Sequence, residues 1–331
     1  MTEQQWSFAS SESGATTIQA ATQSGRGIPD DWKRSLATRT EVRRGDASEC
    51  YQAAQLRSVA LLALLWRHRD NARLQHLLDN LWLSRRRVRS HITPGGLAHG
   101  PIGREEVPRG DRWDNEIPAL FCSHLTSHAV WPSDEICELL ERNAALFRDE
   151  FGGIDPKLYQ VDTRDKRSGL TDGRNWTVFP FYDGLGKLQV DNARRCPRIA
   201  EFLGSLAGTG RIGCMAFFSI MNPKTHVPRH TSQLNTRMRY HLGIEVPERD
   251  VHFRIHDQLI AWKQDRCIKI DDSYEHEVFQ QSDRRRVVFI LDLPHPELLP
   301  EELEFLEQIM RCSIDGSALD GIFETAGSFE R

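Results

Sequence analysis

Two patterns of apolar and polar residues divide the chain. Residues 51–91 place apolar side chains such as Leu56, Ala60 and Leu64 at helical spacing, which predicts helices. From about Trp176 onward, short apolar runs such as WTVFPFY and RRVVFILDL are separated by Gly, Pro, Asn and Asp. Many short strands at close spacing are typical of an antiparallel sandwich or barrel. We therefore expect a helical region followed by a mainly β core.

The same patterns predict three regions along the 331 residues. Residues 1–30 are rich in Ser, Thr, Gln, Gly and Ala, lack periodicity, and are expected to form a mobile tail. Residues 31–130 are expected to be mainly helical and to end in a linker rich in Gly and Pro. Residues 131–331 are expected to form one domain, which opens with a helix at Ser133.

Composition narrows the class of protein. The chain has 43 Lys and Arg against 47 Asp and Glu, a net charge of -4, so no global positive field favours nucleic acid. The longest apolar run, Val59–Trp66, is too short to span a bilayer, and the first residues lack the basic and apolar segments typical of a signal peptide. The seven cysteines are scattered without a CxxC pair. We expect a cytoplasmic protein that binds neither nucleic acid nor membranes.

The predicted helical region is rich in arginine. Between Arg57 and Arg89 there are eight Arg and two Asp. A solvated basic face is the more common outcome of such a pattern. The alternative is a docking surface for an acidic peptide or a carrier protein. The sequence leaves both interpretations open.

Two of the predicted strands carry residues that could bind a ligand. In RMRYHLGIEV, alternation places Arg237, Arg239 and His241 on one face and apolar side chains on the other. In RRRVVFILDL, Arg284 and Arg286 share a face, so at least one arginine is expected at the mouth of an otherwise apolar strand. The planar guanidinium can bind both oxygens of a carboxylate. The strands therefore indicate a barrel that binds anions.

Histidines are concentrated in the same part of the chain. Pro228 stands between His226 and His230, which argues against a helical metal-binding pair. His230 and His276 instead lie near the ends of two predicted strands, and a double-stranded β-helix would bring such strands together. A hydrogen-bonded structural role is the ordinary alternative for any single histidine here.

From about Trp131 to Leu298 the chain resembles the aspartyl/asparaginyl β-hydroxylase family. The matching stretches, in family order, are ELLERNAALFRDE, NWTVFPFYDG, SIMNPKTHVPRHTSQLNTRMRYHLGIEVP, and DDSYEHEVFQ followed by RRVVFILDLPHPEL. Members of this family are iron(II)- and 2-oxoglutarate-dependent oxygenases built on a double-stranded β-helix. The resemblance implies a mainly β, jelly-roll or cupin-like C-terminal core, preceded here by an α-helical N-terminal region.

The resemblance also implies roles for individual residues. The two iron ligands are expected to be His230 and His276. The residues expected to contact 2-oxoglutarate are Ser219, Arg239, His241 and Arg286. Among these, the serine and the last arginine are expected to hold the distal carboxylate. The residues expected to bind the substrate are Arg237 and Arg239.

One departure from the wider oxygenase pattern concerns the metal site. Most non-haem iron oxygenases add a carboxylate to the two histidines, but the residue two positions after His230 is Ser232. The family resembled here omits that carboxylate, with water in its place. Alternative third ligands near the second histidine are Asp271, Asp272, Glu275 and Glu277, for which we expect supporting roles. His226 and His295 are expected to be structural.

The implied activity is hydroxylation of the β-carbon of an aspartyl, asparaginyl or related amino-acid substrate, with use of O₂ and release of succinate and CO₂. The substrate is either a residue of a peptide, or a free or carrier-bound amino acid in natural-product biosynthesis. The alternative from another class is a catalytically silent β-helix that binds a carboxylate ligand or a partner. Retention of His230, His276, Arg286 and Ser219 together favours the enzyme.

Overall fold

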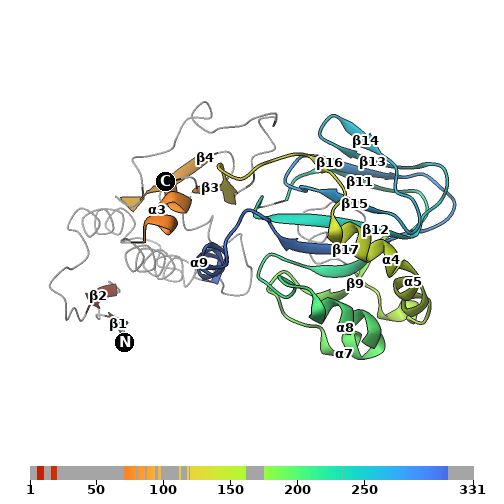
Figure 1. The fold of residues 1–331 in the computed structure, drawn as a ribbon, viewed down its shortest axis with the longest axis horizontal. Coiled ribbons are helices and arrows are strands. Elements are labelled where there is room, and N and C mark those ends of the chain that lie inside the picture. The colour runs from red at the N-terminus through yellow and green to blue at the C-terminus, as the bar shows by residue number, and fades with distance from the viewer. Residues whose placement is uncertain are drawn as a thin grey trace.

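The computed structural model describes residues 6–10, 16–20, 71–79, 81–85, 88–93, 96–97, 112, 118, 120–161, 175–232 and 234–311. Its C-terminal part is a β structure with helices packed against one side (Figure 1). Within the described residues no helix has the length and apolar character needed to cross a membrane.

Two antiparallel sheets form the core of this part. The larger sheet has the strand order β7 (Val130–Trp131), β15 (Cys267–Ile270), β12 (Arg237–Glu245), β17 (Arg286–Pro294), β10 (Ala216–Met221), β9 (Trp176–Tyr182) and β8 (Gln160–Val161). The smaller sheet has the order β11 (Thr225–His230), β16 (His276–Gln280), β13 (Val251–Ile255) and β14 (Gln258–Ile260).

The path of the chain through these sheets defines the fold. Strand β10 lies in the larger sheet, β11 in the smaller, β12 in the larger, β13 and β14 in the smaller, and β15, β16 and β17 continue the alternation. As a result β10 pairs with β17, the first and last strands of the series, and β11 pairs with β16. This order is that of a double-stranded β-helix, so the predicted jelly-roll core is confirmed.

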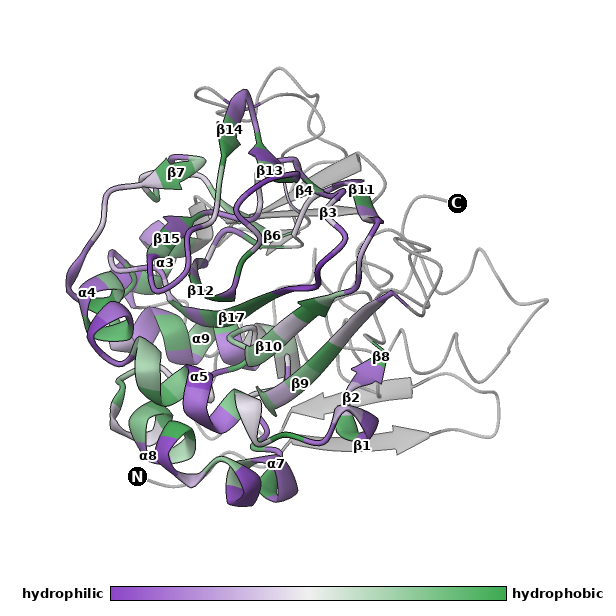
Figure 2. Cartoon of the chain, turned by 90° about the vertical axis from the view of Figure 1, so that its right-hand side faces the viewer, coloured by the Kyte–Doolittle hydropathy of each residue, from purple (hydrophilic) through white to green (hydrophobic). Residues whose placement is uncertain are grey.

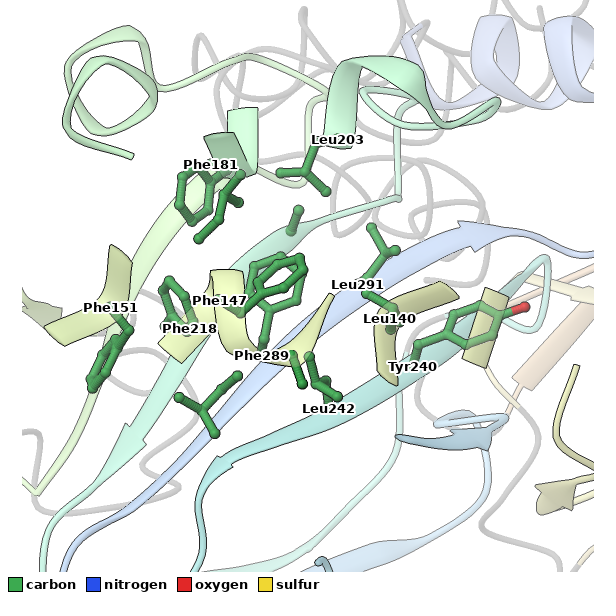
Figure 3. Packing of buried hydrophobic residues seen from close by; sticks show 14 of the residues in the cluster. Leu140, Phe147, Phe151, Phe181, Leu203, Phe218, Tyr240, Leu242, Phe289 and Leu291 are labelled. Carbon is green, nitrogen blue, oxygen red and sulfur yellow. The ribbon is translucent and has the colours of Figure 1, made fainter. Parts of the chain in front are cut away.

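Helices cover the outer face of the larger sheet. They are α4 (Glu135–Arg142), α5 (Ala144–Gly152), α7 (Val190–Arg195) and α8 (Pro197–Ser205), and a 3₁₀ turn, Pro156–Leu158, precedes β8. Phe147 of α5 packs on Phe289 of β17 with ring centroids 4.5 Å apart, inside a mainly apolar layer (Figure 3). The N-cap of α4 is Asp134 rather than Ser133, because its carboxylate accepts from the backbone N–H groups of the first turn.

The inner space between the two sheets has a mixed lining. Val288 and Ile290 of β17 face this space, while Val287, Phe289 and Leu291 face the helices, as the alternation of the strand predicts. Figure 2 shows the hydrophobic colour along β10 and β17. The polar residues that project between the sheets from these strands and β12 are Ser219, Arg237, Arg239, His241, Arg286 and Asp292, all of them buried.

The N-terminal region differs from the prediction. Helix α3 covers Ala72–Asp79, but the predicted helical run beyond it is wrong, since strands β3 (Leu81–Arg85) and β4 (Val88–Thr93) pair there. Two further strands lie inside the expected linker. Strand β6 (Leu120–Cys122) pairs with β3, and strand β5 (Gly96–Leu97) pairs with β4. The local pairing of β3 with β4, together with the long-range pairing of β3 with β6, overrides the helical spacing.

The two ends of the chain add three further elements. Strands β1 (Trp6–Ser10) and β2 (Thr16–Ala20) form a hairpin within the segment expected to be a tail. Helix α9 (Pro300–Arg311) follows the last strand of the barrel. The expected helices over 51–70 lie outside the described residues. The division into three regions therefore stays a prediction. The prediction of helix is wrong where strands β3 and β4 stand in its place.

Candidate active site

Two histidines from neighbouring strands meet at one end of the smaller sheet. His230 ends β11 and His276 begins β16, the two are register partners, and their ring centroids are 4.1 Å apart. The Nδ1 atom of each ring lies 2.8 Å from a backbone carbonyl oxygen two residues earlier, that of Pro228 or Tyr274. Because a carbonyl only accepts, Nδ1 carries the proton and the lone pair lies on Nε2. This is the tautomer in which histidine commonly binds a metal.

Electrostatics keep the second histidine neutral. Burial first, and then the neighbouring His230, lower the pKa of His276 to about 3. A metal ligand must be unprotonated, so the ring is in the required state throughout the neutral range. The sequence alone could place these two residues at strand ends, and the structure brings them together.

Carboxylates near this pair are engaged elsewhere. Asp271 accepts from Arg112 at 2.6 Å, and Glu275 accepts from Arg254 at 2.8 Å. Glu277 lies 2.8 Å from the ring of His226. Among the described residues no three His, Cys, Asp or Glu side chains gather as a metal site.

The serine two positions after the first histidine also has a role of its own. The hydroxyl of Ser232 accepts from Arg237 at 3.0 Å, and its backbone N–H donates to the carbonyl oxygen of Asp272 at 2.8 Å. The second bond connects the chain directly after one histidine to the loop that precedes the other. The site with two histidines and no protein carboxylate stays a prediction.

Arg286 is a buried cation with no acidic partner among the described residues. It is 2% exposed, donates through Nη1 to Ser219 Oγ at 3.0 Å, and lies 4.3 Å from the centre of the Trp262 ring. Its Nε has no hydrogen-bond partner in the part of the chain that the structure describes. Burial lowers the pKa of Arg286 to about 9, which still leaves it charged at neutral pH. A desolvated guanidinium without a counterion is a receptor for an anion.

His241 provides a second donor at the same place. The indole N–H of Trp262 donates to its Nδ1 at 3.2 Å, so the ring proton resides on Nε2. That Nε2 has no partner within the described residues. Burial, followed by the charges of Arg239 and Arg286, lowers the pKa of His241 well below its usual value. The neutral ring therefore offers one N–H donor beside the buried guanidinium.

The two arginines expected to bind substrate are paired inside the protein. Arg239 donates to both oxygens of Asp292, at 2.7 and 2.8 Å, and lies 2.7 Å from Asp272. Arg237 lies 3.0 Å from the same two carboxylates. Two cations and two anions thus form a neutral buried cluster. Their substrate role stays a prediction, and the structure adds the two acids.

Sequence reasoning missed three residues of the site. Asp292 gave a signal, namely a carboxylate at an inward-facing position of an otherwise apolar strand. Trp262 and Trp176 gave none: the first contacts Arg286 and His241, and the second donates its indole N–H to Ser219 at 3.0 Å. Their roles follow only from the packing of distant segments.

The two histidines expected to be structural have partners away from the site. His226 Nε2 lies 2.8 Å from Glu277, and its ring stacks on Phe279 with centroids 4.7 Å apart. The buried His295 lies 3.0 Å from the carbonyl oxygen of Thr126. Both arrangements suit a role in holding the fold together.

Comparisons with known proteins match this region to a family model and to curated relatives. Residues 141–296 match the family model described as aspartyl/asparaginyl beta-hydroxylase. The human aspartyl/asparaginyl beta-hydroxylase is 32% identical over 178 residues, which cover 53% of this chain and 23% of the human protein. The ornithine lipid ester-linked acyl 2-hydroxylase of Rhizobium tropici is 32% identical over 143 residues, or 43% of this chain and 48% of that protein. The chain thus spans a quarter to a half of the length of these two relatives.

Solved structures give weaker matches. A 2OG-Fe(II) oxygenase family oxidoreductase from Burkholderia pseudomallei aligns with 51% of this chain and 96% of its own, at 14% identity and a TM-score of 0.32. A prolyl-4-hydroxylase from Pseudomonas putida aligns with 48% of this chain and 87% of its own, at 13% identity and a TM-score of 0.29. Alignments this weak support no inference, so the fold rests on the strand order itself.

Proposed function

Since residues 141–296 match the family model of aspartyl/asparaginyl beta-hydroxylase, we propose that the chain is an iron(II)- and 2-oxoglutarate-dependent hydroxylase. The observation that supports this most strongly is the pairing of two features. Two histidines share one site, and a buried guanidinium without an acidic partner among the described residues lies in the same barrel. A binding module that holds only a carboxylate would need the second feature and not the first.

The residues of the site fit both Fe(II) and 2-oxoglutarate. Imidazole nitrogen is a suitable ligand for Fe(II), and His230 and His276 both have their lone pair on Nε2. A dicarboxylate such as 2-oxoglutarate needs a cationic receptor, which Arg286 provides together with the Ser219 hydroxyl. The unpartnered Nε2–H of His241 is a further donor for an oxygen of the same ligand. Two of the buried polar atoms without a partner in the described residues, Arg286 Nε and His241 Nε2, are thus available to this ligand.

Iron(II), 2-oxoglutarate and O₂, when bound, would supply the oxidising chemistry that hydroxylates a C–H bond and yields succinate and CO₂. The protein contributes position, charge and exclusion of water. Arg286 and Ser219 fix the far end of the cosubstrate, and the ring of Trp262 covers the guanidinium. Apolar side chains such as Val288 and Ile290 line part of the space between the sheets. A dry, pre-arranged site of this kind strengthens each charged contact within it.

For the substrate, we propose an aspartyl or asparaginyl side chain, or a related amino acid, either in a peptide or carried by another protein. The name of the human relative supports this class, whereas the name of the Rhizobium relative refers to a lipid acyl chain. The two relatives are equally similar to this chain, so identity alone does not choose between them. The neutral cluster of Arg237, Arg239, Asp272 and Asp292 favours a polar substrate, because one donor, Arg237 Nε, and one acceptor, Asp272 Oδ1, have no partner within the described residues.

The test is turnover with defined reactants. Purified protein is loaded anaerobically with Fe(II) and 2-oxoglutarate, O₂ is admitted with candidate peptides or amino acids, and succinate is measured. We expect succinate from the wild-type protein and none from His276→Ala. Tight binding of 2-oxoglutarate without any succinate, for every substrate class tried, would favour the silent binding module instead.

A further inference from the structure

Arg112 lies outside the family match at 141–296, yet its side chain contacts the loop that precedes a histidine of the site. Its side chain is 1% exposed, and its Nη2 donates to Asp271 Oδ2 at 2.6 Å. The guanidinium also lies 3.8 Å from the centre of the Tyr274 ring. An arginine that is stacked and ion-paired in a buried place fixes both partners at once.

The residues that Arg112 contacts belong to one short loop. This loop, residues 271–275, connects β15 to β16 and ends directly before His276. Ser127 reinforces the contact, because its hydroxyl accepts from Arg112 Nε at 3.2 Å and lies 3.2 Å from the Tyr274 hydroxyl. The loop is therefore held from outside at its first residue and at Tyr274.

Tyr274 is also the residue that orients the histidine. Its carbonyl oxygen accepts from His276 Nδ1 at 2.8 Å, which sets the tautomer and the rotation of the ring. A shift of the Tyr274 backbone would therefore move the nitrogen that faces the metal. The contacts run from Arg112 through Tyr274 to His276 without a gap.

We propose that Arg112 is a positioning residue for the metal ligand His276, so that a residue ahead of the family-matching region sets the metal affinity of the site. This inference rests on the proposed function, because it takes His276 to be a ligand. Loss of the groups that orient a metal-binding histidine typically lowers metal affinity about 10- to 100-fold. We expect a loss of this size when the side chain of Arg112 is replaced by an apolar one.

The experiment measures binding of Co(II), as a stable substitute for Fe(II), by calorimetry and by the visible absorption of the bound ion. Arg112→Met is expected to raise the Co(II) dissociation constant about 10- to 100-fold and to alter the absorption. Arg112→Lys keeps the charge without the fork and should lie between Arg112→Met and wild type. The matched control is Arg285→Met, since Arg285 also pairs with a carboxylate, Glu245, and lies over a ring, Phe151, but away from the site. The control should bind Co(II) as wild type does.

The possible outcomes separate the positioning role of Arg112 from the metal site itself. Wild-type Co(II) affinity in a folded Arg112→Met variant would overturn the positioning role and leave the metal site standing. If that variant does not fold by circular dichroism, Ser127→Ala decides, with weaker Co(II) binding expected and unchanged binding contradicting the role. Failure of the wild type to bind Co(II), or unchanged binding by His230→Ala, would instead refute the proposed metal site itself.

Discussion

Replacement of Arg286 by methionine tests the cosubstrate site, because the structure predicts opposite effects on binding and on stability. Met fills much of the same volume and removes the charge. Loss of one partner from a buried charge-assisted pair costs about 2–5 kcal/mol, which corresponds to a rise of about 30- to 4,000-fold in the 2-oxoglutarate requirement at about 1.4 kcal/mol per factor of ten. We expect the upper half of that range, because the guanidinium is already desolvated before the ligand arrives.

The same substitution should leave the ligand-free protein as stable as before or more stable. In the ligand-free protein Arg286 is a buried charge that no described carboxylate neutralises, and removal of such a charge relieves its desolvation cost. The assay is 2-oxoglutarate titration of the metal-loaded protein under anaerobic conditions, together with urea unfolding of the ligand-free form. Arg285→Met is the control for a change of net charge, since Arg285 pairs with Glu245 at the surface. An unchanged 2-oxoglutarate requirement in Arg286→Met would refute this assignment.

Three further predictions follow from the same geometry. Trp262→Phe keeps an aromatic ring over Arg286 but loses the hydrogen bond that sets the tautomer of His241. Because such a bond is worth about 1 kcal/mol, the KM for 2-oxoglutarate should rise about fivefold. An unchanged KM would contradict this prediction. Asp292→Asn breaks a buried ion pair and should lower the free energy of unfolding in urea by about 3–5 kcal/mol, whereas a loss below about 1 kcal/mol would show that the cluster adjusts. Because the folded pKa of His276 is lowered to about 3, only the unfolded chain takes up this proton between about pH 6.5 and 3, so metal-free stability should fall as pH falls through that window. His276→Gln should flatten that fall, and an identical pH profile would count against the lowered pKa.

The sequence predicted the faces of the barrel strands well. Strand alternation is a local property, so the inward direction of Arg237, Arg239 and His241 could be inferred from period two alone. The helix-facing side of β17, with Phe289 at its centre, was equally accessible to this reasoning. The meeting of His230 and His276 required more, namely the strand order of a double-stranded β-helix, which came from the family resemblance.

The partners of these side chains could not be predicted in the same way. Asp292 neutralises Arg239 across two neighbouring strands, and nothing local shows which charges will meet. Trp262 reaches the site from a segment that follows β14, and Arg112 from outside the matched domain. The helical interpretation of 81–91 was wrong partly for a related reason, since the pairing of β3 with β6 is long-range information.

The central claim is that His230, His276 and Arg286 form one site for Fe(II) and 2-oxoglutarate. The most direct measurement adds 2-oxoglutarate anaerobically to the Fe(II)-loaded protein and records the visible charge-transfer band that a 2-keto acid gives when it chelates Fe(II). We predict a saturable band in the wild type, none in His230→Ala or His276→Ala, and a band that needs far more 2-oxoglutarate in Arg286→Met. A wild type without the band, or a band of full strength in both histidine variants, would contradict the account.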